Sequence, residues 1–370
     1  MQRNDQYWMA RALRQARCGL YTTQPNPRVG CVIVRDDQCL GEGFHQVAGG
    51  PHAEINALQA AASNGVDNAT VYVTLEPCAH TGRTPPCSQA LIKAGPKRVV
   101  VAMTDPNPLV AGRGIEQLRQ AGIEVDCGML QTQAEQLNRG FIKRMRTQRP
   151  FVRVKMASTL DGRSALANGV SQWVTGAAAR RDVQFLRAQS SAVLSTAVTV
   201  IADDASLNVR LQPQELGQEL AVRQPVRVVL DPEMRLTGRE AMFSIDSPVW
   251  IFTANPGAAN NQLAAMQHVE LIEQGLAGEK FDLDAVMQQL AAREINEVHT
   301  ECGAVLAGGL FQARLVDELV VYQSLSLFGN RARGLFELGE ISIMSDRVRL
   351  ALRDIRQVGD DIRLTTVPEY

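Results

Sequence analysis

The chain has 370 residues with 38 basic and 39 acidic side chains, so its formal net charge is −1 at pH 7. Hydrophobic residues make up 45% and charged residues 21%, an ordinary globular composition that excludes a long disordered or collagen-like chain. No apolar run approaches the roughly 18 residues of a membrane span, and the first twenty residues lack the apolar core of a secretory signal. Seven cysteines are an odd number for a disulfide framework. We therefore expect a cytoplasmic protein of about two domains with no membrane partner.

The charge is distributed unevenly between the two halves. Residues 1–149 carry a net charge of +5 and residues 150–370 a net charge of −6, yet residues 1–138 have equal numbers of both signs. The basic surplus is the run RGFIKRMRTQR at 139–149. We interpret this run as a solvated helix end and linker. The alternative is a phosphate-binding patch, and a basic patch is also typical of nucleic-acid binding.

Predicted strands and helices alternate in the first half. Buried or β-branched runs indicate strands, and helix formers bounded by Pro or Gly indicate helices. This alternation predicts an α/β layer with a mixed or parallel sheet. In chain order we expect a strand at 29–34, a strand at 40–45, a helix at 52–62, a strand at 69–77, a helix at 85–95, a strand at 98–106, a helix at 112–122, a strand at 123–129 and a helix at 131–146.

The pattern starts again at Pro150, so we place the boundary between domains 1–147 and 148–370. The second half also reads as α/β, with a Gly-rich helix start near its middle and two β-rich segments at its end. We expect strands at 151–159, 226–231, 248–254 and 297–302, a strand-like run at 191–202, and helices at 177–190, 283–295 and 303–315. An unassigned segment at 315–329 and the two β-rich segments at 348–359 and 360–367 follow.

One histidine and two cysteines in the first half have the chemistry of a catalytic zinc site. His52 opens a predicted helix, Cys78 ends a predicted strand, and Cys87 opens the next helix. Catalytic zinc takes three protein ligands and one open position. Glu54 lies two residues past the imidazole, where its carboxylate can reach a metal-bound water. The alternative is that His52 caps a helix and both cysteines belong to the core.

This arrangement has the logic of zinc nucleobase deaminases, in which H-x-E is followed by P-C-x-x-C and the Glu moves protons. In that chemistry a zinc-bound hydroxide attacks the carbon that carries the amino group. The spacing differs here, because Thr81 stands three residues after Cys78 and the second thiolate candidate is nine residues away.

That nine-residue spacing resembles the bifunctional deaminase/reductase family of riboflavin biosynthesis, the RibD family. EPCAHTGRTPPC at 76–87 is similar to the family motif, and the resemblance extends over nearly the whole chain. The other matching segments are QPNPRVGCVIV, GEGFH, PHAEINAL and TDPNPLVAGRG in the first half, and KMASTLDGR, SQWVTG, RRDVQFLRA, TVIADDASLNVR and TECGAVLAGGL in the second.

For the first half, the resemblance implies a cytidine-deaminase-like three-layer α/β/α domain. It implies deamination of 2,5-diamino-6-ribosylamino-4(3H)-pyrimidinone 5′-phosphate, with one Zn²⁺ per chain on His52, Cys78 and Cys87 and proton transfer by Glu54. Four positions match residues expected near the base or the phosphoribosyl group: Asn26, His45, His80 and Arg83. Each has an alternative reading as an ordinary loop residue. Asp105 and Asn107 are better explained as turn formers.

The second half alone says less about its chemistry. No G-x-G-x-x-G follows its first strand, so a Rossmann site is not indicated. Glycines at the start of the helix at 303–315 suit a phosphate, or else close helix packing. Lys155 is either a snorkelling edge residue or an anion ligand.

For this half the resemblance implies a dihydrofolate-reductase-like α/β domain that transfers a hydride from NADPH to the ribosyl group of 5-amino-6-(5-phosphoribosylamino)uracil. The implied cofactor contacts are Ala157, Trp173, Thr199, Asp203, Gly303, Ala304, Val305, Leu306, Ala307, Gly308 and Gly309. The implied substrate contacts are Lys155, Ser171, Arg187, Leu207, Arg210 and Glu301. Positions that depart from the family pattern are Thr159, Ala205, Asn208, Cys302 and Ala304.

Two other functions compete with this one. A deaminase that grips RNA with the basic run is disfavoured, because residues 1–138 are neutral and aromatics are only 5% of the chain. A structural zinc module is disfavoured by the three-ligand set and Glu54. We expect phosphoribosyl pyrimidines as partners, no nucleic acid, and a homodimer or larger homo-oligomer as the family suggests.

Overall fold

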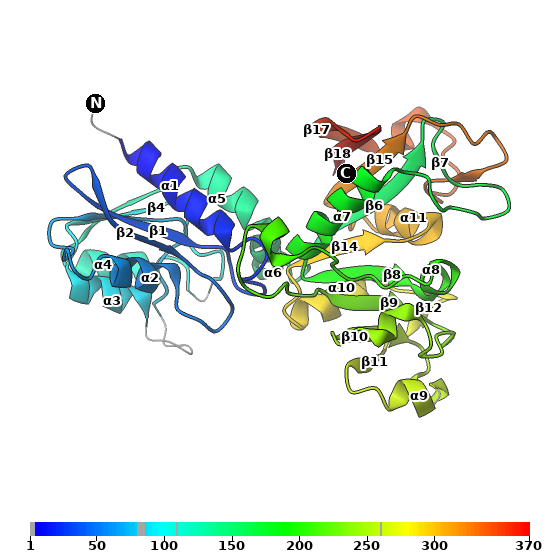
Figure 1. Cartoon of the computed structure of the whole chain (residues 1–370), viewed down its shortest axis with the longest axis horizontal. Helices are drawn as coiled ribbons and strands as arrows, with labels where there is room; N and C mark the ends of the chain where they lie inside the picture. Colours follow the sequence, from blue (N-terminus) through cyan, green and yellow to red (C-terminus); the bar gives the residue numbers. More distant parts are fainter. Residues whose placement is uncertain (1–3, 80–85, 109, 260) are drawn as a thin grey trace. The chain divides into compact units, whose positions relative to one another are not determined.

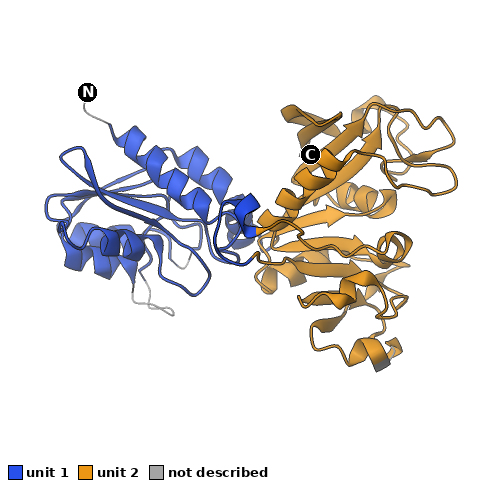
Figure 2. Ribbon diagram, in the orientation of Figure 1, with its two compact units in different colours: residues 1–148, 213–221 blue, residues 149–212, 222–370 orange. Residues whose placement is uncertain are grey.

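The computed structural model describes residues 4–79, 86–108, 110–259 and 261–370, and its elements are labelled in Figure 1. The chain forms two compact units (Figure 2). One comprises residues 1–148 and 213–221, the other residues 149–212 and 222–370. The α/β class expected from the sequence is confirmed in both units. In the described part of the chain, every helix is too short or too polar to cross a bilayer.

The first unit is built on a five-stranded sheet in the order β2-β1-β3-β4-β5. β1 pairs antiparallel with β2 and β3, whereas β3, β4 and β5 run parallel. Helices α1 and α5 lie on one face and α2, α3 and α4 on the other (Figure 1), which makes three layers. The elements are α1 Asp5–Cys18, β1 Gly30–Arg35, β2 Gln38–Phe44, α2 Ala53–Ala60, β3 Thr70–Val73, α3 Cys87–Ala94, β4 Arg98–Val101, α4 Arg113–Gln120, β5 Glu124–Cys127, α5 Gln131–Leu137 and α6 Arg139–Thr147.

The second unit contains a nine-stranded sheet in the order β11-β10-β9-β8-β14-β6-β15-β18-β17. Neighbouring strands are parallel from β11 to β15, and the terminal hairpin β17–β18 is antiparallel. The elements are β6 Phe151–Thr159, β7 Arg163–Ala165, α7 Ala177–Gln189, β8 Ala192–Thr196, α8 Ala197–Asp203, β9 Val226–Leu230, β10 Val249–Thr253, α9 Asn261–Ala264, β11 Val269–Glu273, β12 Leu276–Ala277, β13 Lys280–Phe281, α10 Leu283–Ala292, β14 Glu297–Glu301, α11 Ala304–Gln312, β15 Glu318–Ser324, β16 Arg333–Gly334, β17 Arg349–Val358 and β18 Asp361–Glu369.

Helix α1 was not expected from the sequence. Its charges hide an amphipathic pattern, in which Trp8, Met9, Ala12, Leu13 and Ala16 are buried along one face. The Asn4 side chain caps the helix by accepting a hydrogen bond from the Tyr7 N–H. The helix packs against β1, where Gly30 permits close approach.

Two other predicted elements are divided in the structure. The single helix expected at 131–146 breaks at Asn138, whose buried amide bonds both the N–H and the carbonyl of Arg28, at 2.8 and 3.0 Å. The strand-like run at 191–202 is a strand only to Thr196, whose hydroxyl then caps α8 by accepting from the Thr199 N–H. In both places a side-chain hydrogen bond to the backbone interrupts the element.

The close approach of α1 to β1 gives a test of this packing. A Cβ on Gly30 would lie 2.1 Å from the Ala12 carbonyl oxygen and 2.5 Å from the Ala16 nitrogen. Because both are backbone atoms, we expect Gly30→Ala to lower the free energy of unfolding of the first unit by about 1–3 kcal/mol in urea denaturation. Gly275→Ala is the control, since no atom lies within 4 Å of its Cβ. Equal stability of the two variants would contradict the packing.

Candidate functional site

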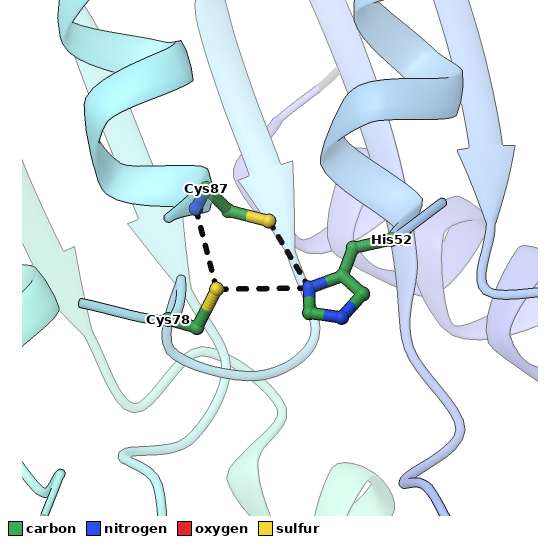
Figure 3. Close-up of side chains that lie close together, drawn as sticks. All are labelled: His52, Cys78 and Cys87. Carbon is green, nitrogen blue, oxygen red and sulfur yellow. Dashed lines mark hydrogen bonds between the residues drawn. The ribbon is translucent and has the colours of Figure 1, made fainter. Parts of the chain in front are cut away.

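Three potential metal ligands meet at one place in the first unit. His52 is the residue before α2, Cys78 follows β3 after Pro77, and Cys87 is the first residue of α3. Their ligand atoms all lie within 4.8 Å of one another. His52 Nδ1 is 3.2 Å from Cys87 Sγ and 3.6 Å from Cys78 Sγ, and the three side chains point toward a common centre (Figure 3).

These distances fit a tetrahedral zinc ion. Bonds of about 2.0–2.1 Å to nitrogen and 2.3 Å to sulfur separate the two ligand atoms by roughly 3.5 Å at a tetrahedral angle. One imidazole and two thiolates leave a fourth position open, as catalytic zinc requires. The alternative of a helix-capping histidine finds no support, since the His52 side chain makes no capping hydrogen bond to α2.

The thiols of Cys78 and Cys87 differ in their hydrogen bonding. The Cys87 N–H donates to Cys78 Sγ over 3.2 Å. Hydrogen bonds from the Cys87 side chain, and from His52, lower the pKa of Cys78 to about 4. The pKa of Cys87 is raised, because its thiol donates to Cys78 and is buried. One thiolate is therefore favoured at neutral pH before any cation binds.

Glu54 lies beside this cluster in the first turn of α2. Its side chain is only 3% exposed, and this burial raises its pKa to about 7. A carboxyl group with a pKa near neutrality can both accept and return a proton. Glu54 is therefore suited to transfer protons to and from a molecule bound beside His52, Cys78 and Cys87.

Glu76 is a second buried carboxylate, for which the sequence analysis predicted no role. Its two oxygens accept four backbone N–H groups: from Asp105 at 3.0 Å, Gly112 at 2.9 Å, Gly114 at 2.9 Å and Ile115 at 3.4 Å. These donors belong to the segment that follows β4 and to the first turn of α4. Because Glu76 stands two residues before Cys78, it anchors that segment to the strand end that carries a thiolate. The only feature of the sequence that could have indicated this role is the position of Glu76 in the E-P-C motif.

Two of the four predicted pyrimidine contacts are described. Asn26 Nδ2 is 3.0 Å from His45 Nε2, and the His45 ring packs edge to face on His52 with centroids 5.4 Å apart. Burial lowers the pKa of His45. His80 and Arg83 lie outside the described residues. Asp105 forms the expected turn, since its Oδ1 accepts the Asn107 N–H at 2.8 Å.

A group of charged side chains meets in the second unit at the middle of β6 and the carboxyl end of β14. Lys155 and Glu301 are register partners on these strands. Arg187 of α7 donates from Nε and Nη2 to the two Glu301 oxygens, at 2.5 and 2.9 Å, and from Nη1 to the Asn208 carbonyl at 2.8 Å. Burial alone would raise the pKa of Glu301, but Arg187 holds it well below its usual range. Burial lowers the pKa of Lys155, and Glu301 partly offsets this.

His299 also belongs to this group of side chains, although the sequence analysis did not predict it. It is fully buried on β14, and its Nε2 lies 3.3 Å from Glu301 Oε1. Burial lowers its pKa. Strand alternation was the available signal, because residues 299 and 301 must share a face.

The other residues that were predicted to bind the cofactor or the substrate of the reductase lie on several different elements. Ala157 lies on β6, Thr199 and Asp203 lie on α8, and Ser171 and Trp173 precede α7. Trp173 is exposed and stacks against the Arg180 guanidinium at 4.3 Å. Arg210 is exposed, and its N–H donates to Gln184.

Part of the predicted cofactor segment belongs to the core. Leu306 and Ala307 are buried in the main hydrophobic cluster of the second unit, and a Cβ on Gly308 would lie 2.0 Å from the Glu337 carbonyl oxygen. The open part is the helix start, Gly303 to Val305, where Val305 is half exposed. Leu207, a predicted substrate contact, is likewise a buried core side chain.

Asp161 and Cys302 have local explanations. Asp161 accepts hydrogen bonds from the Thr159 hydroxyl and from the Phe328 and Gly329 N–H groups, so it anchors a turn. Burial raises the pKa of Cys302 to about 12. Its thiol therefore stays protonated, and a protonated thiol is less reactive toward oxidants than a thiolate.

Comparison with known proteins identifies the family of each half of the chain. A family model described as the RibD C-terminal domain matches residues 150–364, and the cytidine and deoxycytidylate deaminase zinc-binding region matches residues 2–103. Riboflavin biosynthesis protein RibD of Escherichia coli (strain K12) is 47% identical over 98% of this chain and 99% of its own length. The chain belongs to the RibD family. RibD of Haemophilus influenzae is 48% identical over 99% of this chain and 98% of its own length.

Solved structures agree with this membership. The chain superposes on Acinetobacter baumannii RibD with a TM-score of 0.90 at 45% identity, covering 99% of each chain. It superposes on a Thermotoga maritima protein with a TM-score of 0.86 at 34% identity, covering 98% of each. The latter is titled a diaminohydroxyphosphoribosylaminopyrimidine deaminase/5-amino-6-(5-phosphoribosylamino)uracil reductase. The chain is thus a bifunctional enzyme of riboflavin biosynthesis, with a deaminase and a reductase activity.

The anchoring role of Glu76 can be tested by an isosteric change. In Glu76→Gln one oxygen becomes an NH₂ group that faces backbone N–H donors, so two hydrogen bonds are lost in a buried place. We expect the free energy of unfolding of the first unit to fall by about 2–3 kcal/mol and bound zinc to be lost at lower chelator concentration.

Glu42→Gln is the matched control for this variant. Glu42 pairs with Arg11 at 2.6 Å, with both side chains 30% exposed, so its loss costs less than about 1 kcal/mol. Unchanged zinc retention in Glu76→Gln would remove the link between this carboxylate and the metal ligands.

Proposed function

We propose that residues 1–147 deaminate 2,5-diamino-6-ribosylamino-4(3H)-pyrimidinone 5′-phosphate and that residues 148–370 reduce the ribosyl group of 5-amino-6-(5-phosphoribosylamino)uracil to ribityl with NADPH. The observation that carries the proposal is the convergence of His52, Cys78 and Cys87 beside the buried Glu54. The full-length similarity to a protein titled with both activities supports the choice of substrates.

In the deaminase, His52, Cys78 and Cys87 would hold one Zn²⁺, which would supply a water molecule that ionises near pH 7. The Glu54 carboxylate is placed to accept a proton and to return protons to the ring nitrogen and to the departing ammonia. The net change replaces the C–NH₂ group by C=O and releases NH₃. Because Glu54 is buried, its proton exchanges with the reacting groups rather than with bulk solvent.

In the reductase, NADPH supplies the hydride and the protein positions it. We assign the cofactor to Ala157, Trp173, Thr199, Asp203 and the exposed start of α11 at residues 303–305, where free N–H groups suit a phosphate. Lys155, Ser171, Arg187, Arg210 and Glu301 bind the substrate. Since Arg187 is already paired with Glu301, Lys155 and Arg210 carry the positive charge available for the substrate phosphate.

The cysteines fit the cytoplasmic location that we propose. All seven are free. Two of them are the assigned zinc ligands, which must stay reduced to bind metal. A reducing compartment maintains that state.

A homodimer formed through the β17–β18 hairpin is also part of the proposal. β17 ends the nine-stranded sheet. A bulge at residue 353 keeps Leu350, Leu352 and Ile355 on one face, opposite Pro368, Thr366 and Leu364, and these three apolar side chains are 42–59% exposed. A long apolar edge strand of this kind is normally covered, and a second copy of the chain would cover it.

The two-site assignment predicts separable losses of activity. Glu54→Gln should lower the rate of ammonia release about 10³- to 10⁴-fold, because it cannot accept the proton of water. NADPH oxidation with the deaminated uracil compound should remain. Lys155→Ala should do the reverse, with reductase kcat/KM about 100-fold lower because a cation for the phosphate is lost.

Each variant is the other's control, since both are assayed for both half-reactions with equal zinc content. Loss of both half-reactions in either folded variant contradicts the division of labour. A wild-type protein that releases no ammonia from the diaminopyrimidinone contradicts the proposed substrate.

The dimer is tested by placing a charge on the exposed face of β17. Leu352→Asp should shift the protein toward monomers in light scattering at micromolar concentration, because an unpaired carboxylate would be buried between copies. Leu276→Asp is the control, since Leu276 is 41% exposed elsewhere in the same unit. A monomeric wild-type protein, or equal masses for both variants, would rule out this interface.

A further inference from the structure

His45 lies between a predicted pyrimidine contact and a metal ligand, and both of its ring nitrogens are occupied. Nδ1 is 3.0 Å from the Pro51 carbonyl oxygen, and Nε2 is 3.0 Å from Asn26 Nδ2. The ring is only 3% exposed and packs at 84° on His52. Neither nitrogen is free to bind a substrate directly.

The chemistry of these partners determines where the protons lie. A backbone carbonyl can only accept a hydrogen bond, so Nδ1 must carry the proton that is donated to Pro51. In the neutral ring, Nε2 then has a lone pair and must accept. The Asn26 amide meets this lone pair with its NH₂ group, as the geometry requires.

This contact fixes which end of the Asn26 amide faces outward. Its NH₂ group is used by His45, and its backbone N–H is used by the Thr23 carbonyl at 2.8 Å. Among the residues that the structure describes, none donates a hydrogen bond to Asn26 Oδ1, and the side chain is half-buried. The carbonyl oxygen is therefore an oriented acceptor, on a side chain bound to the ring that packs against the ligand His52.

We propose that His45 is a positioning residue of the deaminase, which acts through Asn26 and makes Oδ1 an obligatory acceptor for an N–H or amino group on the edge of the pyrimidine. This inference rests on the proposed function and deepens it. The site then accepts a ring edge that donates at this point and rejects one that presents a nitrogen lone pair, because two facing acceptors cannot bond. His45 was expected to contact the substrate itself, and the geometry points to an indirect role.

The proton assignment is directly measurable in the zinc-loaded, full-length protein. Nitrogen-15 NMR distinguishes a protonated ring nitrogen from one with a lone pair, and the signals missing from His45→Gln identify this residue. The expected result is a proton on Nδ1 and a lone pair on Nε2. A proton on Nε2 overturns the proposal, because Asn26 would then present its NH₂ group to the substrate.

A double-mutant cycle tests whether His45 acts through Asn26. The variants are Asn26→Ala, His45→Phe and the combination, assayed for ammonia release at equal zinc content. We expect kcat/KM to fall about 100-fold in Asn26→Ala and about tenfold or more in His45→Phe, with the double variant no worse than Asn26→Ala. Losses that multiply in the double variant mean that His45 contributes independently, which overturns the proposal.

A rescue variant guards against a purely structural effect of the ring. His45→Gln keeps one donor for Pro51 and one acceptor for Asn26, so its kcat/KM should lie closer to wild type than that of His45→Phe. Equal losses in both variants contradict the hydrogen-bond role. The reductase half-reaction, unchanged in every variant, shows that the chain is folded.

The same assay separates this inference from the proposed function. If wild-type protein deaminates the diaminopyrimidinone and the cycle is multiplicative, only the role of His45 fails. If wild-type protein does not deaminate it, the substrate assignment fails, while the NMR result still reports the His45 tautomer.

Discussion

Parallel strand pairing is the constraint on which both sites depend. Because parallel strands end at the same edge of a sheet, β3 and β4 deliver Cys78 and the Glu76-bound segment to one edge. In the second unit, the pairing of β6 with β14 brings Lys155 beside Glu301. Helix starts then complete the first site, with His52 before α2 and Cys87 at the start of α3. Strand register and the positions of these helix starts thus bring together residues that are far apart in the sequence.

The two buried glutamates of the first unit, Glu54 and Glu76, have different surroundings. Glu76 is surrounded by four backbone N–H donors, which replace the water that burial removes. Glu54 has less compensation, and its pKa rises to about 7. Glu76 is fixed in place by these backbone hydrogen bonds, whereas Glu54 can exchange its proton. The same residue type thus serves architecture and chemistry within one small region.

The sequence predicted what is encoded locally. The ligands of the metal cluster stood out because imidazole and thiolates at strand ends and helix starts are rarely accidental, and most buried strands followed from β-branched runs. Elements that depend on distant partners were missed. The break at Asn138 requires Arg28, which is 110 residues away, and the role of Glu76 requires a segment after another strand. Periodicity also cannot show that Leu207 and Leu306 turn into the core while their neighbours stay open.

The contact between α11 and the segment near Glu337 has a dynamic consequence. The Glu337 N–H donates to the Ala304 carbonyl at 3.1 Å, and Gly308 leaves no room between the helix and the Glu337 backbone. The first turn of α11 therefore cannot tilt or fray without displacing this segment. A molecule seated on the start of α11 would be felt about 30 residues further along the chain, as slower amide exchange around Glu337 rather than as a change in the helix alone.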